Sequence, residues 1–404
     1  MDAADKVQPW HDFTAKLQQR ELLPIIVEYI DWQRKMRRAR DNGGIEPAMP
    51  RNWAPLSINL DLTTACNYAC GHCIDWSSLN TKFKHDHECL LASLDYLIKH
   101  GLRSVILIGG GEPTIYPKFG EIVRFIKERN LQVAIVSNGS RCQIICDVAG
   151  FLSRKDWVRL SLDAGSDDTF QRMHNPKMVV ALEEICSWAS RIRKVNPISF
   201  GFSFIIAWQG AKRGDVPIIQ NIDEIVTAAK LARRYGFSYI SFKPILTRYP
   251  SGAEVMDAGV IENFALIREK IAEAKTYETA DFKVIESVNL KVLLNGDWHN
   301  FTNQPRICHM QAFRQVLSPL GLYNCPAHRG VPKARIAGKN AFSSAEKSDE
   351  TREATAGILS RFDASRECKE ITCLYNPVNI WLERIVKNEI GMSSEGLDQS
   401  DYFL

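Results

Sequence analysis

The sequence lacks the features of a membrane or secreted protein. No stretch of its 404 residues approaches the roughly 18 consecutive apolar residues of a membrane-spanning helix, so we expect no membrane span. The first residues, MDAADKVQPWHDF, contain no basic segment followed by an apolar one, so we expect no secretory signal and a cytoplasmic location. Charge is nearly balanced at +4. We therefore interpret the densest basic patch, residues 34–40, as the solvated face of a helix and expect no nucleic-acid partner.

An internal repeat is also absent, whereas cysteine is plentiful. The chain has eleven cysteines. In a cytoplasmic protein this number indicates metal or redox chemistry rather than structural disulfides. The length suggests two or three domains with a large core.

Short β-rich runs alternate with segments of helical periodicity. The expected strands are residues 56–62, 104–110, 132–139, 157–164, 198–207 and 239–245. The expected helices are residues 87–101, 118–130, 179–195, 222–237 and 260–275. This alternation predicts parallel β/α units joined by right-handed crossovers. Six strands fall short of the eight of a closed barrel, so we expect an α/β fold with an open, partial (β/α)6 barrel.

The segments on either side of the barrel have a different composition. Residues 10–40 have the pattern of an amphipathic helix with a break at Pro24. After about residue 280 the alternation stops, and the polar segment 337–357 is expected to be mobile or a surface excursion. We predict a helical extension over 1–52, a barrel over 53–280 and a further domain over 281–404.

Three cysteines follow the first expected strand within eight residues: Cys66, Cys70 and Cys73. A loop at the carboxyl end of a barrel strand lies on the face where β/α barrels place their chemistry. Zinc usually takes four ligands in two pairs. His72 is a possible fourth ligand, but it lies between Cys70 and Cys73 and would strain the loop. A [4Fe–4S] cluster on three thiolates fits better, since its fourth iron stays open; structural zinc and incidental buried cysteines are the alternatives.

The C-x3-C-x2-C spacing resembles the signature of the radical S-adenosylmethionine (radical SAM) superfamily, and the resemblance extends over roughly residues 55–250. It implies that the amino and carboxylate groups of SAM chelate the open iron. Reduction of the cluster then breaks a carbon–sulfur bond, giving methionine and a 5′-deoxyadenosyl radical that abstracts hydrogen from a substrate. It also implies that His72, in a position that is typically aromatic, packs near the adenine.

Further motifs at strand ends resemble the same family. Gly110, Gly111, Glu112 and Pro113 match its Gly-Gly-Glu-Pro motif. Glycine lets the backbone approach a ligand, and a carboxylate is a strong acceptor for the SAM ammonium group.

Two later strand ends complete the expected SAM site. The resemblance places Ser137 and Asn138 near the methionine moiety, and Ser161 and Asp163 near the ribose hydroxyls and the carboxylate. Ordinary turn chemistry at strand ends is the alternative for these four residues.

The C-terminal part contains a second cysteine set: Cys308, Cys325, Cys368 and Cys373. Four thiolates satisfy zinc or a [4Fe–4S] cluster. The first pair, with Gly321 before its second cysteine, resembles SPASM and Twitch domains, and four cysteines imply the Twitch form with one auxiliary [4Fe–4S] cluster, for electron transfer or structure. Zinc or no metal are the alternatives. The remaining cysteines, Cys89, Cys142, Cys146 and Cys186, lack ligand spacing and are predicted to be small buried hydrophobic residues.

The sequence says less about the substrate. The layout resembles Twitch enzymes of the 2-deoxy-scyllo-inosamine dehydrogenase type, which favours oxidation, dehydration, epimerisation or rearrangement of a small polar metabolite such as a sugar, aminocyclitol or nucleoside. A peptide maturase and a non-catalytic Fe–S or zinc protein are the alternatives. An electron donor of the flavodoxin or ferredoxin type is expected. Candidate substrate contacts are Lys243, Arg248, Tyr249, Glu286 and Asn289; no catalytic acid or base is assigned.

Overall fold

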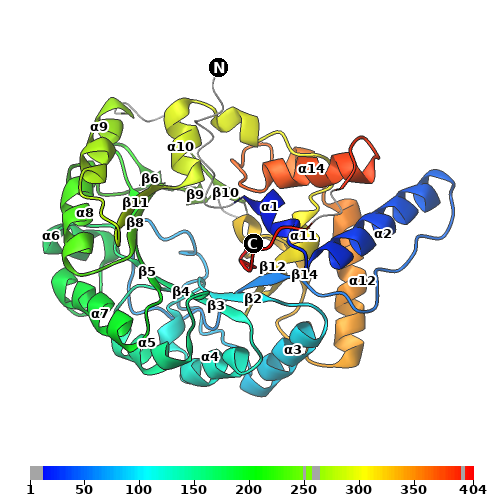
Figure 1. Ribbon diagram of the computed structural model, residues 1–404, viewed down its shortest axis with the longest axis horizontal. Coiled ribbons are helices and arrows are strands. Elements are labelled where there is room, and N and C mark those ends of the chain that lie inside the picture. Colours follow the sequence, from blue (N-terminus) through cyan, green and yellow to red (C-terminus); the bar gives the residue numbers. More distant parts are fainter. Residues whose placement is uncertain (1–11, 249–251, 257–263, 393–395) are drawn as a thin grey trace.

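The computed structural model shows a strongly curved sheet with helices around its outside (Figure 1). The structure describes residues 12–248, 252–256, 264–392 and 396–404. Ten strands form the main sheet in the order β11-β8-β5-β4-β3-β2-β1-β12-β13-β14. Because this order has two ends among the described residues, the barrel stays open, as predicted.

All six expected strands form and pair in parallel. Their bounds are β1 Ser57–Leu60, β2 Ser104–Leu107, β3 Gln132–Ser137, β4 Trp157–Ser161, β5 Ser199–Ile206 and β8 Tyr239–Pro244. Side chains alternate between the two faces of a strand. Phe200, Phe202 and Phe204 therefore all point outward, where they are fully buried beneath the helices.

The sheet continues beyond the six strands at both edges. β11 (Lys283–Glu286) pairs in parallel with β8, and β12 (Arg314–Ser318) pairs in parallel with β1. β13 (Gly321–Tyr323) and β14 (Arg335–Ala337) follow as antiparallel strands. One sheet therefore runs across the boundary predicted at residue 280, and the domain division stays a prediction.

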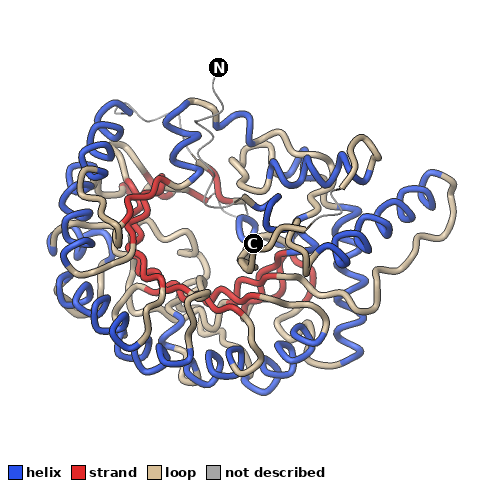
Figure 2. The backbone as a smooth tube through the Cα atoms, viewed as in Figure 1, coloured by secondary structure: helices blue, strands red, loops and turns tan. Residues whose placement is uncertain are grey.

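Helices cover the outer face of the sheet (Figure 2). They are α3 His87–Lys99, α4 Phe119–Lys127, α5 Cys142–Val148, α6 Asp167–His174, α7 Leu182–Val195, α8 Ile225–Arg234 and α9 Phe264–Lys275. All five expected helices form, although residues 260–263 of the last lie outside the described residues. α5 and α6 were not predicted, because seven or eight residues give too few turns for a clear periodicity.

Shorter elements complete the chain. Further helices are α10 Val288–Asn295, α11 Met310–Phe313, α13 Ala364–Glu367 and α14 Asn376–Val386. Two small hairpins are formed by β6 Lys212–Arg213 with β7 Val216–Pro217, and by β9 Thr247–Arg248 with β10 Glu254–Val255. No helix in the described ranges combines the length and apolar character needed to cross a bilayer.

The N-terminal helical pattern divides at the predicted proline. α1 (Phe13–Leu17) ends before Pro24, which lies in the first turn of α2 (Leu23–Asp41). The basic patch on α2 is only partly solvated, which corrects the expectation. Arg37 pairs with Glu383 of α14 at 2.7 Å, and Arg34 donates to the carbonyl of Ile385 at 2.7 Å.

The polar segment 337–357, expected to be mobile or a surface excursion, is largely helical and lies partly at the surface. Most of it belongs to α12 (Ala345–Arg361), whose side-chain cap is Ser344. Ser348, Thr351 and Thr355 are buried, and their hydroxyls donate to backbone carbonyls one turn earlier. Because these bonds satisfy the hydroxyl groups, a polar sequence can form a buried helix face.

The amino ends of the barrel strands are covered by residues 400–404. Ser104 begins β2 and donates its hydroxyl to the carbonyl of Tyr402 at 2.7 Å. Gln132 begins β3 and accepts from the N–H of Tyr402 at 2.9 Å. Phe403, only 6% exposed, packs with the inner face of β2 and β3 and edge-on against Trp157 of β4.

Candidate active site at the carboxyl edge of the barrel

The three-cysteine loop joins β1 to α3 at the carboxyl edge of the sheet. All three cysteines are free thiols. Two isolated bridges fasten the loop, from Thr63 to Lys84 and from Tyr68 to Pro176. The buried ring of Tyr68 anchors its middle against Phe170 of α6. The loop is therefore held at both ends and in the middle.

The thiols of this loop lie close to one another in a buried setting. Burial raises the pKa of Cys66 and Cys70, and it raises the pKa of Cys73 to about 12. Negative charge on the neighbouring thiols raises the pKa of Cys70 and Cys73 further. The thiols are therefore protonated unless a metal supplies positive charge, which is how thiolate sites couple binding to proton release.

The two glycines of the Gly-Gly-Glu-Pro motif let this turn pack on the cysteine loop. A Cβ on Gly111 would lie 2.1 Å from the carbonyl oxygen of Ala65. Gly110 has φ +67°, and its Cβ would lie 3.1 Å from the carbonyl oxygen of Thr63. The two glycines therefore let this turn lie against the backbone of the cysteine loop. Pro113, the last residue of the motif, begins a short 3-10 turn, Pro113–Ile115.

Glu112 contacts two of the other predicted SAM residues, Ser137 and Asn138. Its carboxylate is only 2% exposed, and burial raises its pKa. It accepts from the Ser137 hydroxyl and from the Asn138 N–H, each at 2.8 Å, and from the Thr114 hydroxyl at 2.6 Å. The Asn138 amide lies 3.9 Å from the sulfur of Cys66. These contacts bring the second and third strand ends to the cysteine loop.

The side chains of His72 and Asp163 also contact each other, and their SAM roles stay predictions. The Nε2 of His72 lies 3.0 Å from Oδ2 of Asp163, and Oδ1 accepts from the Ile205 N–H at 2.7 Å. Burial alone would raise the pKa of Asp163, but the bond from His72 and the neighbouring histidine charges lower it. Ser161 ends β4 on the inner face, two residues before this carboxylate.

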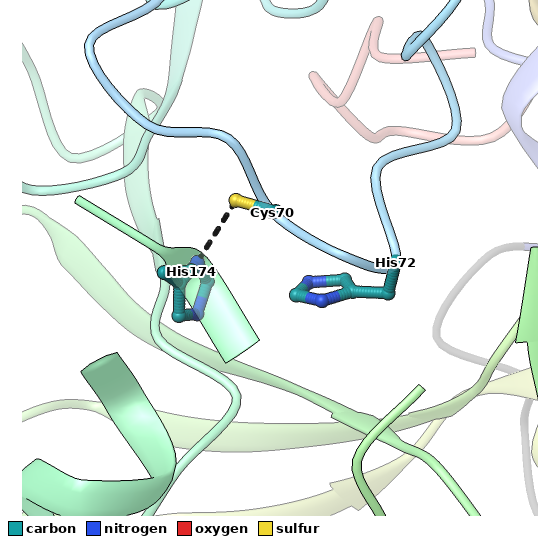
Figure 3. A group of neighbouring side chains, drawn as sticks. All are labelled: Cys70, His72 and His174. Atoms are coloured by element: carbon teal, nitrogen blue, oxygen red, sulfur yellow. Dashed lines mark hydrogen bonds between the residues drawn. The ribbon is translucent and has the colours of Figure 1, made fainter. Parts of the chain in front are cut away.

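Sequence reasoning missed His174, the last residue of α6. Its Nδ1 lies 3.2 Å from the sulfur of Cys70, and its Nε2 lies 2.9 Å from the carbonyl of Leu162 (Figure 3). Burial lowers the pKa of this histidine to about 4. Cys70 and His174 are 104 residues apart, so no local spacing signalled the contact.

Cys70, His72 and His174 are the only His, Cys, Asp or Glu trio in the described ranges whose ligand atoms all lie within 4.8 Å of one another. This group offers a single ion one thiolate and two imidazoles, and it leaves out Cys66 and Cys73. The buried Nδ1 of His72 has no hydrogen-bond partner among the described atoms. That open nitrogen fits the adenine contact implied for His72, and it also fits the single-ion alternative.

A buried charge network that was not predicted fastens the cysteine loop from the C-terminal part. Arg329 pairs with Asp61 at 2.9 Å and with Asp75 at 2.7 Å. Asp75 also accepts from the N–H of Gly110 at 3.3 Å. Burial opposes the charge on Arg329, but the carboxylates of Asp61, Asp75 and Glu254 outweigh it and raise its pKa. Arg329 therefore holds the loop and the glycine turn together.

The same network makes a pH-dependent contribution to stability. Burial raises the pKa of Asp61 to about 7 from its ordinary 3.8, although Arg329 opposes this. A folded pKa above the unfolded value means that stability falls as pH rises through this interval. We expect the free energy of unfolding of Asp61→Asn, minus that of the wild type, to rise between about pH 4 and 7 and then to level off.

Urea unfolding at several pH values measures this difference. Asp147→Asn, at an exposed position on α5, is the matched control and should show no comparable rise. A difference for Asp61→Asn that is constant from pH 4 to 8 contradicts the assignment.

The predicted substrate residues that the structure describes lie at or shortly after the carboxyl ends of the neighbouring strands β8 and β11. Lys243 donates to the Ser203 hydroxyl at 3.0 Å on the inner face of the sheet. Arg248 pairs with Glu254 at 2.7 Å, and Glu286 pairs with Lys275 of α9. Asn289 lies on α10 with its Oδ1 buried and unpartnered among the described residues. Tyr249 lies outside the described residues. These substrate roles stay predictions.

The four C-terminal cysteines also converge. Burial raises the pKa of Cys308, and of Cys325 to about 12, and the charges of the other thiols add to the rise at Cys325, Cys368 and Cys373. Asn379 of α14 donates to the sulfur of Cys308 at 3.4 Å.

The spacing of these sulfurs bears on the choice of metal. Zinc–sulfur bonds of about 2.3 Å in a tetrahedron put sulfurs within roughly 4 Å of one another. No three of these described sulfur atoms lie within 4.8 Å of one another. These sulfurs therefore do not form a zinc-sized group among the described atoms, and the choice between zinc and a cluster stays a prediction.

Two of the other cysteines match their prediction. Cys142 and Cys186 are buried in the hydrophobic core between the sheet and the helices. Cys89 and Cys146 are partly exposed, so for these two the burial prediction was only approximate.

Part of the barrel is similar to a known protein family. The family model of the Radical SAM superfamily matches residues 60–210, from the end of β1 past the end of β5. Mycofactocin maturase MftC of Mycolicibacterium smegmatis is 30% identical over 186 residues, which are 45% of this chain and 43% of that protein. An S-adenosylmethionine-dependent nucleotide dehydratase of a Thermoplasmatales archaeon is 32% identical over 110 residues, 27% of this chain and 38% of that protein. The matches span less than half the length of each relative.

Solved structures show the same fold. SuiB of Streptococcus suis bound to S-adenosylmethionine superposes with a TM-score of 0.55 at 14% identity, covering 87% of this chain and 76% of that one. The enzyme anSMEcpe with bound AdoMet gives 0.50 at 14% identity, covering 83% and 96%.

The fold, the three-cysteine loop and the family match agree. Residues 60–210 match the model of the radical SAM superfamily, whose cofactors are a [4Fe–4S] cluster and S-adenosylmethionine, and the solved structures show the same fold. The prediction of a radical SAM enzyme fold is thereby confirmed. The Twitch-type C-terminal domain and the 2-deoxy-scyllo-inosamine dehydrogenase-type layout stay predictions.

Proposed function

We propose that Cys66, Cys70 and Cys73 hold a [4Fe–4S] cluster and that the chain cleaves S-adenosylmethionine reductively beside it. When bound and reduced, this cluster supplies the electron that splits S-adenosylmethionine into methionine and a 5′-deoxyadenosyl radical, which removes hydrogen from a substrate. One observation carries the proposal: the ends of β2, β3 and β4, through Glu112, Asn138 and Asp163, are each hydrogen-bonded to the cysteine loop.

The residues of the chain have separate tasks in this proposal. Glu112 is fixed by Ser137, Asn138 and Thr114, so its carboxylate is already oriented for an ammonium group. His72 is fixed through Asp163 and keeps its Nδ1 open for the adenine. His174 orders the side chain of Cys70 from the other side. These contacts prepare the site before a ligand arrives.

The test is production of 5′-deoxyadenosine. Protein reconstituted with iron and sulfide without oxygen is mixed with S-adenosylmethionine and dithionite, and the nucleoside is measured by liquid chromatography. We expect formation that depends on both S-adenosylmethionine and reductant, with at least about four irons per chain. Protein that binds one zinc ion instead and forms no 5′-deoxyadenosine would match the single-ion alternative and refute the proposal.

We propose further that the four C-terminal cysteines hold an auxiliary [4Fe–4S] cluster that exchanges electrons with the reaction. Replacing Cys308 and Cys325 together by alanine should lower bound iron by about four per chain and impair product formation, while some S-adenosylmethionine cleavage remains. Iron analysis and product yield measure the two effects. Cys89→Ala, at a partly exposed position, is the control. Full product yield in the double variant contradicts the electron-transfer role.

The finer part of the proposal is a small polar metabolite as substrate and a flavodoxin- or ferredoxin-type electron donor. The inner face of β4, β5 and β8 supports it, because serines and cations replace apolar side chains there. Modification of a peptide is the second candidate. It is favoured by the similarity of 45% of the chain to a mycofactocin maturase.

A further inference from the structure

Two cations on the inner face of the sheet have no acidic partner. Arg159 of β4 and Lys243 of β8 are half-buried, and neither forms an ion pair with a described residue. Among the described residues, the Lys243 ammonium donates only to the neutral hydroxyl of Ser203, at 3.0 Å, and Nε of Arg159 is buried without a hydrogen bond. The one carboxylate whose charge acts on both, Asp163, is already engaged by His72 and Ile205.

The strand register shows how these side chains are layered. Parallel partners at one register point to the same face. Arg159, Gly201 and Tyr239 form one row across β4, β5 and β8. The next row toward the carboxyl edge consists of three serines: Ser161, Ser203 and Ser241. Lys243 lies one row further, and its ammonium turns back toward the serine row. Three hydroxyls therefore lie between the two cations.

Arg159, the cation nearer the amino ends of the strands, is contacted by an aromatic ring. The guanidinium of Arg159 lies over the ring of Trp157, 5.4 Å from its centroid. Gly201 leaves room for the ring of Tyr239, because a Cβ there would lie 2.2 Å from that ring. These contacts fix the position of the guanidinium without neutralising it.

The arrangement is costly for the chain alone. Two like charges repel, and half-buried charges lose hydration without a partner. Burial, together with the charge of Arg159, lowers the pKa of Lys243 well below its ordinary range. Burial also lowers the pKa of Arg159. A bound anion would offset both penalties. Arg248, by contrast, already has Glu254 as its partner.

We propose that Arg159, Lys243 and the serine row bind an anionic group of the substrate, a carboxylate or a phosphate. Both groups accept several charge-assisted hydrogen bonds, which guanidinium and ammonium groups supply. The rest of the substrate extends toward the carboxyl edge, where the three-cysteine loop lies. This inference rests on the proposed function and names the charge of the substrate for that same site.

Isothermal titration calorimetry of the reconstituted protein, saturated with S-adenosylmethionine, tests the proposal. The probes are sodium phosphate and sodium acetate, with sodium chloride at equal ionic strength as the blank. We expect saturable binding of at least one probe near one site per chain. Lys243→Met and Arg159→Met should each raise its Kd about 10-fold or more.

Matched controls lie on the helices that cover the outer face of the sheet. Arg191 lies over the Trp188 ring at 4.8 Å, and Lys230 lies over the Tyr277 ring at 5.0 Å, both at exposed positions. Arg191→Met and Lys230→Met remove the same charges from similar aromatic contacts and should change Kd less than about twofold.

The outcomes separate the sources of the anion. Binding of phosphate alone indicates a phosphorylated substrate, binding of acetate alone a carboxylate, and binding of both the shared chemistry. No saturable binding to the wild type, or unchanged Kd in both methionine variants, overturns the proposal. Should a methionine variant fail to fold, Lys243→Arg and Arg159→Lys decide: binding retained supports a charge-based site, and binding lost in folded protein refutes it. Failure of anion binding while 5′-deoxyadenosine still forms refutes this inference alone.

Discussion

Replacing Cys66, Cys70 or Cys73 by alanine is expected to abolish 5′-deoxyadenosine formation. Each substitution removes one of the three proposed ligands, and the loop has no further cysteine to take its place. A cluster held by two thiolates is unstable, so bound iron should fall as well. Measured against the wild type, the rate should drop to the level without protein. The double variant Cys142→Ala/Cys186→Ala is the matched control, because these cysteines are buried in the core between the sheet and the helices.

The three variants can differ in the metal that they still bind. Cys70 is the thiol that contacts His174, so its loss also frees the histidine. If Cys66→Ala or Cys73→Ala retained a metal ion while Cys70→Ala did not, the single-ion group of Cys70, His72 and His174 would be the functional one. Retention of wild-type 5′-deoxyadenosine formation in any of the three contradicts the proposed function.

Replacing Arg329 by methionine is expected to destabilise the fold by about 3–5 kcal/mol. Removing one partner of a buried ion pair leaves uncompensated charge behind, and here two carboxylates, Asp61 and Asp75, lose their guanidinium. Methionine retains much of the side-chain volume, so the loss reports charge rather than a cavity. Urea unfolding with an unchanged m-value measures it.

The control for Arg329 lies close by. Arg335 is an exposed arginine at the start of β14, and Arg335→Met should stay within about 0.5 kcal/mol of the wild type. A loss below about 1 kcal/mol in Arg329→Met would mean that the network is rehydrated and does not fasten the loop. Combining Arg329→Met with Asp61→Asn should recover part of the loss, because one orphaned charge is then removed.

The barrel and most of the site could be predicted from local patterns. The parallel strands follow from runs of apolar residues between helical segments, and the position of Cys66, Cys70 and Cys73 after β1 follows from that order. Glu112, Ser137, Asn138 and Asp163 lie at neighbouring strand ends, and parallel strands bring such ends together.

What could not be predicted depends on contacts between distant parts of the chain. β12 pairs in parallel with β1 although more than 250 residues separate them in sequence. Arg329 reaches Asp75 across 254 residues, and His174 reaches Cys70 across 104. The buried serine and threonines of α12 follow the same logic, since only packing distinguishes them from a solvated polar segment.

Phe403 and Trp157 limit the depth of the inner face of the barrel. They lie at the first row of β4, and Asp163 lies six residues further along the chain, which corresponds to at most about 20 Å of extended strand. A guest that enters from the carboxyl edge therefore meets an aromatic floor within that depth. Part of this aromatic floor comes from residues 400–404, which lie far from the barrel strands in sequence. Under the proposed function, a change at Phe403 would alter the depth open to a substrate while leaving the strands themselves unchanged.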